Sequence, residues 1–395
     1  MRSFVPAPGF SGHDQFFATF AKFGGLDKRH AGEWVDEIAS RAADQNEQYL
    51  ELMQTPPFSH AAQIAKEIGW PVDGPVDFAR MRQALLDRGL RDEVQVDLDN
   101  IRQTESSRKQ IERCGTADGS PACSVQIRYI YQILRAMPPE MVFAQTLLGF
   151  EVVEKSIDAG ADGFVGINFV QPEDGYVSMS NYTVEMKMVG YLHSIYPKVH
   201  ISLHAGELAP GLVPPEGVRF HIREAVEMGQ AERIGHGVDV MYERDPHKLL
   251  KEMADKHVMV EINLSSNEGI LGVKGEEHPL LEYLKARVPV AFSTDDEGVS
   301  RIDLTHEYVR AAEDYHLSYQ ELKTMAQTGM EHGFLPGESL WAAEDDFRTE
   351  RGPCRGEVAG GDKPSAGCKS FLDRSQKAAA EWELERRFRM FERQF

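Results

Sequence analysis

The sequence VHISLHAGE, residues 199–207, decides the fold. Apolar residues run into His204, the small Ala205 and Gly206 permit a sharp turn, and Glu207 follows at once. Two later stretches repeat this design, RIGHG at 233–237 and PVAFSTDD at 289–296. Each places a metal-binding or proton-carrying side chain at the carboxyl end of a short apolar strand. In a parallel α/β barrel such strand ends meet on one face of the molecule.

Strand and helix patterns alternate outward from this stretch in both directions. Strands are predicted at 49–53, 125–130, 163–170, 199–204, 233–236, 258–264 and 289–295. Helices are predicted at 30–46, 77–113, 138–160, 182–196, 218–228, 245–256, 279–286, 304–316 and 318–332, with a glycine-rich loop after 264. This alternation predicts an α/β fold of the TIM-type (β/α)8 class, with seven of eight strands visible and extra helices.

The chain divides into three predicted parts. Residues 1–348 are expected to form the barrel. Residues 349–369 are rich in glycine, proline and charge, and are expected to be a mobile loop. Residues 370–395 are expected to form a charged C-terminal helix that packs on the barrel.

The charge balance limits the class of partner. The 395 residues include 43 basic and 63 acidic side chains, a formal charge of −20. This balance argues against a nucleic-acid partner, because binding to phosphates requires cationic side chains. No apolar run is long enough to cross a bilayer, so no membrane partner is expected. A small neutral or cationic molecule is the favoured ligand.

The four cysteines form two close pairs, Cys114 with Cys123 and Cys354 with Cys368. Two local disulfides are expected if the protein is exported, and free thiols if it is cytoplasmic. The N-terminal residues lack the apolar core of a signal peptide. The two observations point to different compartments.

The strand ends carry side chains suited to zinc chemistry. His204 and Asp295 are candidate ligands, since imidazole and carboxylate both bind zinc. His236 can accept a proton from water, and Glu207 can pass a proton to a substrate. Asp296 can bind substrate or hold a ligand. A single histidine at a strand end is usually structural, and an Asp-Asp pair is typical of a turn; three such strand ends in order favour a catalytic site.

These motifs, HAGE at 204–207, RIGHG at 233–237 and STDD at 293–296, resemble the adenosine deaminase family of the amidohydrolase barrels. The resemblance extends from about Phe16 to Pro336. It implies zinc-dependent hydrolytic deamination of adenosine or 2′-deoxyadenosine, with one Zn²⁺ ion and a purine nucleoside as substrate. By that analogy His204 and Asp295 bind zinc, Glu207 protonates purine N1, His236 positions the hydroxide and Asp296 contacts N7. Phe20 and Phe23 would line the nucleoside pocket.

The sequence departs from the family pattern in two places. Family members begin with a strand ending in His-x-His, which supplies two zinc ligands, and no His-x-His occurs here. We therefore expect the sequence to be an N-terminally truncated form of a longer protein, whose missing segment carried this strand. The protein is expected to be exported if that segment also held a signal peptide, and cytoplasmic otherwise. Two protein ligands are fewer than the three that a catalytic zinc ordinarily has. Gln171-Pro172 also replaces the family's Ala-Gly turn before Glu173, which is expected to weaken the contact with the base.

Three alternatives stay open at this point. The chain could deaminate another amino-purine, or it could be an inactive barrel that serves as a binding or signalling module. The chain could also be a purely structural protein, in which every one of these motifs is a turn or a helix cap. Zinc content and the loss of adenosine absorbance, measured on wild type and on Glu207→Gln, separate the structural protein from an enzyme.

Overall fold

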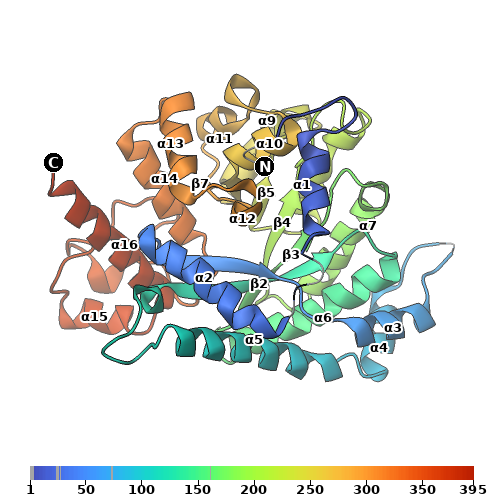
Figure 1. Ribbon diagram of the computed structural model, residues 1–395, viewed down its shortest axis with the longest axis horizontal. Coiled ribbons are helices and arrows are strands. Elements are labelled where there is room, and N and C mark those ends of the chain that lie inside the picture. Colours follow the sequence, from blue (N-terminus) through green and yellow to red (C-terminus); the bar gives the residue numbers. More distant parts are fainter. Residues whose placement is uncertain (1–3, 24–25, 27, 73, 161) are drawn as a thin grey trace.

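The computed structural model describes residues 4–23, 26, 28–72, 74–160 and 162–395. Seven parallel strands in this part of the chain form one sheet in sequence order, with β1 and β7 at its edges (Figure 1). The strands are β1 Tyr49–Gln54, β2 Gln126–Leu134, β3 Phe164–Val170, β4 His200–Ala205, β5 Arg233–His236, β6 Met259–Ile262 and β7 Val290–Phe292. All seven predicted strands are confirmed, and the sheet curls into a half-barrel.

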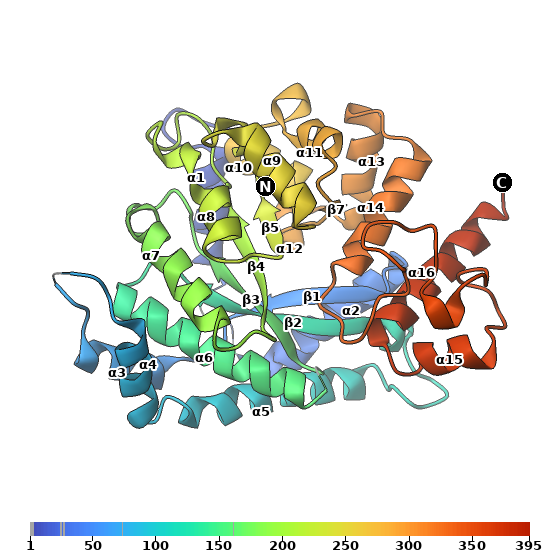
Figure 2. The same ribbon diagram turned by 180° about the vertical axis from the view of Figure 1, so that it is seen from behind.

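Helices cover the outer face of this half-barrel (Figure 2). The helices are α1 Gly12–Phe20, α2 Ala31–Asp44, α3 Ser59–Ile68, α4 Phe78–Asp87, α5 Asp92–Ile111, α6 Pro139–Asp158, α7 Tyr176–His193, α8 His221–Glu227, α9 Pro246–Asp255, α10 Leu264–Leu271, α11 Leu280–Ala286, α12 Glu297–Ser300, α13 Leu304–Asp314, α14 Tyr319–Glu331, α15 Ala366–Leu372 and α16 Gln376–Glu392. No described helix combines the length and apolar character that a bilayer crossing requires.

Three helix predictions are wrong in detail. The helix predicted over 77–113 is two helices, α4 and α5, because Gly89 lies between them with φ +92° and ends the first. The loop predicted after residue 264 begins with helix α10, which ends at Gly272 with φ +72°. Its Ser and Asn residues are weak helix formers, so the pattern hid it. Helix α7 begins at Tyr176, six residues before the predicted start.

Strands β2 to β7 are mostly buried, as parallel strands covered by helices require, whereas the residues of edge strand β1 are half-buried or exposed. In β3 the residues Phe164–Phe169 are all buried. Inside the half-barrel, Arg233 of β5 bonds to Glu51 of β1 (2.6 Å) and Glu261 of β6 (2.9 Å). The guanidinium also lies 3.9 Å from the ring centroid of Phe334. This network joins one edge of the sheet to strands near the other.

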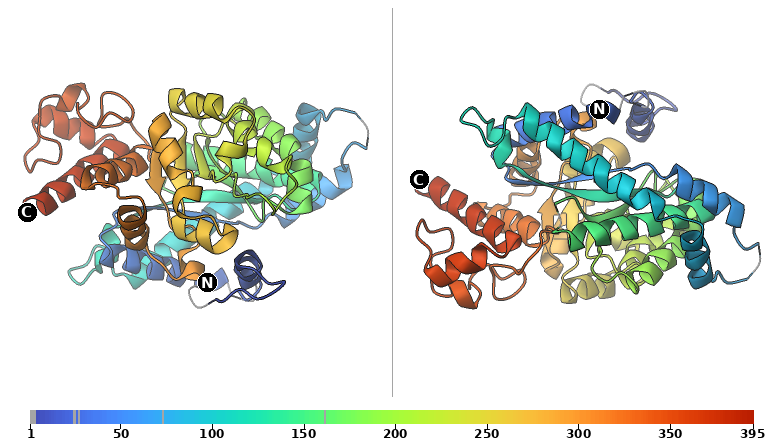
Figure 3. Two further views of the ribbon diagram at one scale, coloured as in Figure 1. Left: turned by 90° about the horizontal axis from the view of Figure 1, so that it is seen from above. Right: turned by 90° about the horizontal axis from the view of Figure 1, so that it is seen from below.

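The C-terminal segment lies to one side of the half-barrel (Figure 3). Its small hydrophobic cluster contains Leu340, Trp341, Cys354, Cys368, Phe371, Ala378 and Trp382. Cys354–Cys368 and Cys114–Cys123 are both disulfide-bonded, with S–S distances of 2.05 and 2.08 Å. Local pairing is therefore the correct alternative for the cysteines. The predicted boundaries at 348 and 369, and the predicted mobility between them, stay predictions.

Candidate metal and catalytic site

The three strand ends singled out by the sequence meet in space. One donor atom from each of His204, His236 and Asp295 lies within 4.8 Å of the other two. The strand register explains this proximity, since His204 of β4 pairs with Gly235 of β5 and Ala205 pairs with His236. Asp295 follows β7 by three residues. Parallel strands thus bring residues 91 positions apart to one face.

His204 is oriented by Asn168 of β3. The amide oxygen Oδ1 of Asn168 lies 2.9 Å from His204 Nδ1 and also accepts the backbone N–H of His204 at 2.9 Å. Burial lowers the pKa of His204 well below its usual value, with the nearby His236 as a further cause. A neutral imidazole with Nδ1 engaged leaves Nε2 as the metal-binding nitrogen.

His236 and Asp295 both have a left-handed backbone, with φ +73° and +52°. Non-glycine residues rarely adopt this conformation, and it clusters at functional sites. Helix α10 and the residue before it contact both side chains. Asn267 Nδ2 lies 3.0 Å and Asn263 Nδ2 3.4 Å from His236 Nδ1. Ser266 Oγ donates to Asp295 Oδ2 at 2.5 Å.

Glu207 lies beside this cluster, with Oε1 3.7 Å from His236 Nδ1. Burial raises its pKa to about 7, with the charges of Asp295 and Glu173 as further causes against the opposing effect of His236. Asp296 has its pKa raised to about 8 by burial and by Asp295. Both carboxyl groups can therefore hold a proton near neutral pH.

Glu173 holds the turn that carries Glu207. Its buried carboxylate accepts the backbone N–H groups of Gly206 and Glu207, each at 2.9 Å, and the ring Nδ1–H of His221 at 2.5 Å. Burial raises the pKa of Glu173, but His221, Arg135 and the Gly206 amide outweigh it and bring the value to about 2. From the sequence, Glu173 was notable only as the residue after Gln171-Pro172, which replaces the family's Ala-Gly turn. The signal in the sequence was an acidic residue three positions after the end of a buried strand.

The predicted pocket residues Phe20 and Phe23 lie at the end of α1 and just beyond it, 40% and 47% exposed. Helix α1 contacts α10, the helix that supports the site (Figure 1). His13 of α1 also bonds to Asp174, in the loop after β3, at 3.0 Å. These contacts hold α1 beside the site, and the contact of Phe20 and Phe23 with substrate stays a prediction.

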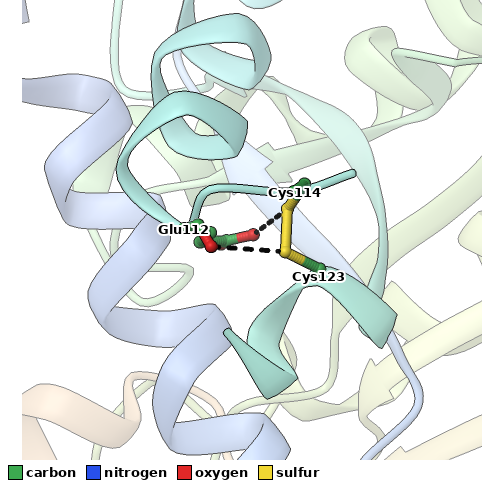
Figure 4. A group of neighbouring side chains, drawn as sticks. All are labelled: Glu112, Cys114 and Cys123. Atoms are coloured by element: carbon green, nitrogen blue, oxygen red, sulfur yellow. Dashed lines mark hydrogen bonds between the residues drawn. A yellow bond between two sulfur atoms is a disulfide. The ribbon is translucent and has the colours of Figure 1, made fainter. Parts of the chain in front are cut away.

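The donor set fits a cation such as zinc. His204 offers a neutral nitrogen and Asp295 a carboxylate held by a hydroxyl group, the arrangement that metal ligands usually show. A second cluster in the described part of the chain, Glu112 with Cys114 and Cys123, has its two sulfurs bonded to each other (Figure 4). Those sulfurs are therefore not available as thiolate ligands.

Comparison with known proteins gives one family match. The family model described as adenosine deaminase matches residues 33–345. The adenosine deaminase of Clostridium perfringens (strain ATCC 13124) is 29% identical over 198 residues, 48% of this chain and 52% of that protein. The adenosine deaminase of Escherichia coli (strain SE11) is 36% identical over 147 residues, 37% of this chain and 41% of that protein. The chain thus spans about half the length of the curated relatives it matches.

Solved structures show a similar fold. The adenine deaminase of Arthrobacter aurescens has a TM-score of 0.55 at 18% identity, covering 83% of this chain and 81% of that one. The N6-methyl-AMP deaminase of Arabidopsis thaliana has a TM-score of 0.53 at 19% identity, covering 81% and 79%. At these identities the similarity is one of fold.

Proposed function

Because this chain belongs to the adenosine deaminase family, we propose that it catalyses the hydrolytic deamination of adenosine or 2′-deoxyadenosine. The products are inosine or 2′-deoxyinosine and ammonia. The observation that carries the proposal is the meeting of His204, His236 and Asp295 within 4.8 Å, with Glu207 beside His236. A cation-binding group and a proton donor then face one substrate position.

One zinc ion would be held by His204 Nε2 and the Asp295 carboxylate. When bound, zinc lowers the pKa of water and makes hydroxide available near neutral pH. In the family a His-x-His strand supplies two further ligands, and this sequence contains no His-x-His.

The two raised carboxyl pKa values match the chemistry of an adenine ring. N1 and N7 of adenine both carry lone pairs, so each needs a hydrogen-bond donor. Glu207, with a pKa of about 7, would protonate N1, which makes C6 electrophilic. Protonated Asp296, with a pKa of about 8, would donate to N7. Water then adds its oxygen at C6, and one of its protons goes to the Glu207 carboxylate, which has just given its own proton to N1. The second proton of the water goes to the amino group, the C6–N bond breaks to release ammonia, and the C6 oxygen becomes the carbonyl of inosine.

The test compares wild type with Glu207→Gln. Zinc content is measured, and turnover is followed by the loss of adenosine absorbance with zinc supplied. We expect Glu207→Gln to lower kcat by about 10²–10⁴-fold, because the amide cannot transfer a proton, while zinc content is retained. The exposed Glu227→Gln on α8 is the control and should keep wild-type turnover. Absence of turnover in zinc-loaded wild type would overturn the proposal.

A purine-binding protein without turnover is the second candidate, favoured by the missing His-x-His. It predicts adenosine binding by calorimetry with no ammonia released. Deamination of another amino-purine is separated by assaying adenine and N6-substituted nucleosides in parallel.

The two disulfides further favour an exported protein, since such bonds persist in oxidising compartments.

A further inference from the structure

A chain of hydrogen bonds runs from helix α11 through α10 to His236. It begins at the backbone N–H of Leu280, which lies 3.2 Å from His278 Nδ1. A backbone amide can only donate, so His278 Nδ1 must accept. Burial lowers the pKa of His278 to about 3, so the ring is neutral and its proton lies on Nε2.

The next bond fixes the orientation of the Asn267 amide. His278 Nε2 lies 3.0 Å from Asn267 Oδ1, and its proton is donated to that oxygen. The NH2 group of Asn267 then faces His236 Nδ1 at 3.0 Å. Because this group can only donate, His236 Nδ1 must accept.

The side-chain amide of Asn263 gives independent evidence that His236 Nδ1 accepts a hydrogen bond. Asn263 Nδ2 lies 3.3 Å from the backbone carbonyl of Glu261 and 3.4 Å from His236 Nδ1. A carbonyl oxygen can only accept, so the atom between it and His236 must be the NH2 nitrogen. A proton on His236 Nδ1 would point at two NH2 groups, and the carboxylate oxygen beside it, Glu207 Oε1, lies 3.7 Å away, beyond hydrogen-bond distance. The proton of the ring therefore belongs on Nε2.

His204 has the opposite arrangement. Asn168 Oδ1 accepts the backbone N–H of His204, so it is an oxygen, and the ring Nδ1 at 2.9 Å must donate to it. The lone pair of His204 is left on Nε2. The two rings lie 5.2 Å apart, centroid to centroid, and differ in which nitrogen carries the proton.

We propose that the Leu280–His278–Asn267 chain fixes His236 as its Nε2–H tautomer, so that His236 donates a hydrogen bond to the attacking oxygen and is neither a metal ligand nor a base. The catalytic part of this proposal rests on the proposed function, whereas the tautomer does not. Asn267 and His278 are positioning residues that act through His236. Of the three clustered donors, only His204 and Asp295 are then left to bind a cation.

The test is a long-range ¹H–¹⁵N correlation spectrum of the full chain with ¹⁵N-labelled histidine, recorded near neutral pH, with the His236 signals assigned by loss in His236→Gln. We expect Nε2–H for His236 and His278, and Nδ1–H for His204. His221, whose Nδ1 donates to Glu173, is the internal control in the same spectrum. A proton on Nδ1 of His236, alone or together with Nε2, would overturn the proposal.

Asn267→Asp tests the role of the chain of bonds. Its carboxylate can only accept, so we expect the His236 proton to move to Nδ1 while His221 is unchanged. In an active enzyme kcat should fall about 10–100-fold with KM unchanged. A folded Asn267→Asp protein in which His236 keeps Nε2–H would refute the positioning role. If the variant does not fold, the wild-type spectrum still decides the tautomer, and neither spectrum depends on turnover.

Discussion

At the scale of single residues, the site uses backbone conformations that strand ends do not ordinarily adopt. The left-handed backbones of His236 and Asp295 cost on the order of 1–3 kcal/mol each. Their side chains are held by Asn267 and Ser266. The surrounding contacts thus hold two strained residues in one geometry, which orients the side chains before a substrate arrives.

Glu173 makes the stability of the fold around the site depend on pH in the acid range. Its pKa of about 2 lies below the ordinary 4.5, so its contribution is present above pH 4.5 and is lost as the pH falls towards 2. Glu173→Gln should lower the free energy of unfolding at pH 7 by a few kcal/mol, on the order of the linkage estimate, and flatten its decrease between pH 4.5 and 2. Urea unfolding across this range is the measurement. An unchanged acid slope would contradict the prediction, and exposed Glu227→Gln should keep the wild-type slope.

Asp296 tests how adenine N7 is recognised. Asp296→Asn keeps a donor at every pH, whereas Asp296→Ala removes it, so we expect kcat/KM of the Asn variant to exceed that of the Ala variant roughly tenfold. The wild type should lose activity as the pH rises through about 8, because deprotonated Asp296 cannot donate. The Asn variant should lack that loss, although Glu207 still limits activity above about 7. Equal kcat/KM values for the two variants would exclude donation to N7.

At the scale of elements, the site depends on the turn after β4 and on helix α10. The turn is held from both sides. Glu173 accepts its N–H groups, while the carbonyl of Gly206 accepts the backbone N–H of Val238 at 2.8 Å. Helix α10 contributes Ser266 and Asn267 from one face. Short segments with several side-chain contacts therefore fix the positions of Glu207, His236 and Asp295.

Gly206 is the position in this turn where a side chain would be hardest to accommodate. Its φ is +75°, and an added Cβ would lie 2.5 Å from Asp239 Oδ1 and 2.7 Å from Ile222. Gly206→Ala should lower the free energy of unfolding by about 2–4 kcal/mol, the sum of backbone strain and overpacking. Gly211→Ala is the control, since Gly211 has φ +93° but open space around its Cβ position, and should cost only about 1–2 kcal/mol. Equal losses in thermal unfolding would mean that the close contact has no effect.

At the scale of the whole molecule, charges inside the half-barrel hold distant strands together. Arg233 lies between Glu51 and Glu261, and Tyr49 also donates to Glu51 at 2.6 Å. Burial of these charges is costly unless they stay paired. The network therefore sets the position of β1 relative to β5 and β6, and with it the curvature of the sheet.

Arg233→Met should lower the free energy of unfolding by up to about 3–5 kcal/mol, because the half-buried carboxylates of Glu51 and Glu261 lose their partner. Adding Glu51→Gln and Glu261→Gln should recover part of the loss. Chemical denaturation of the single and triple variants is the measurement. The exposed Arg102→Met, which breaks a surface pair with Asp99, is the control and should change stability by under about 1 kcal/mol. A triple variant less stable than Arg233→Met would contradict this account.

The sequence by itself determined the strand order and the residues at the strand ends. Apolar runs that end in His204, His236 and Asp295 are local patterns, and parallel strands necessarily bring such ends to one face. Only the tertiary structure decided what holds those residues. Asn168 lies 36 positions from His204, Glu173 lies 34 from Glu207, Asn267 lies 31 from His236 and His278 lies 11 from Asn267. A hydrogen bond between distant segments leaves no periodic trace in a sequence, so these partners emerge only when the chain is folded.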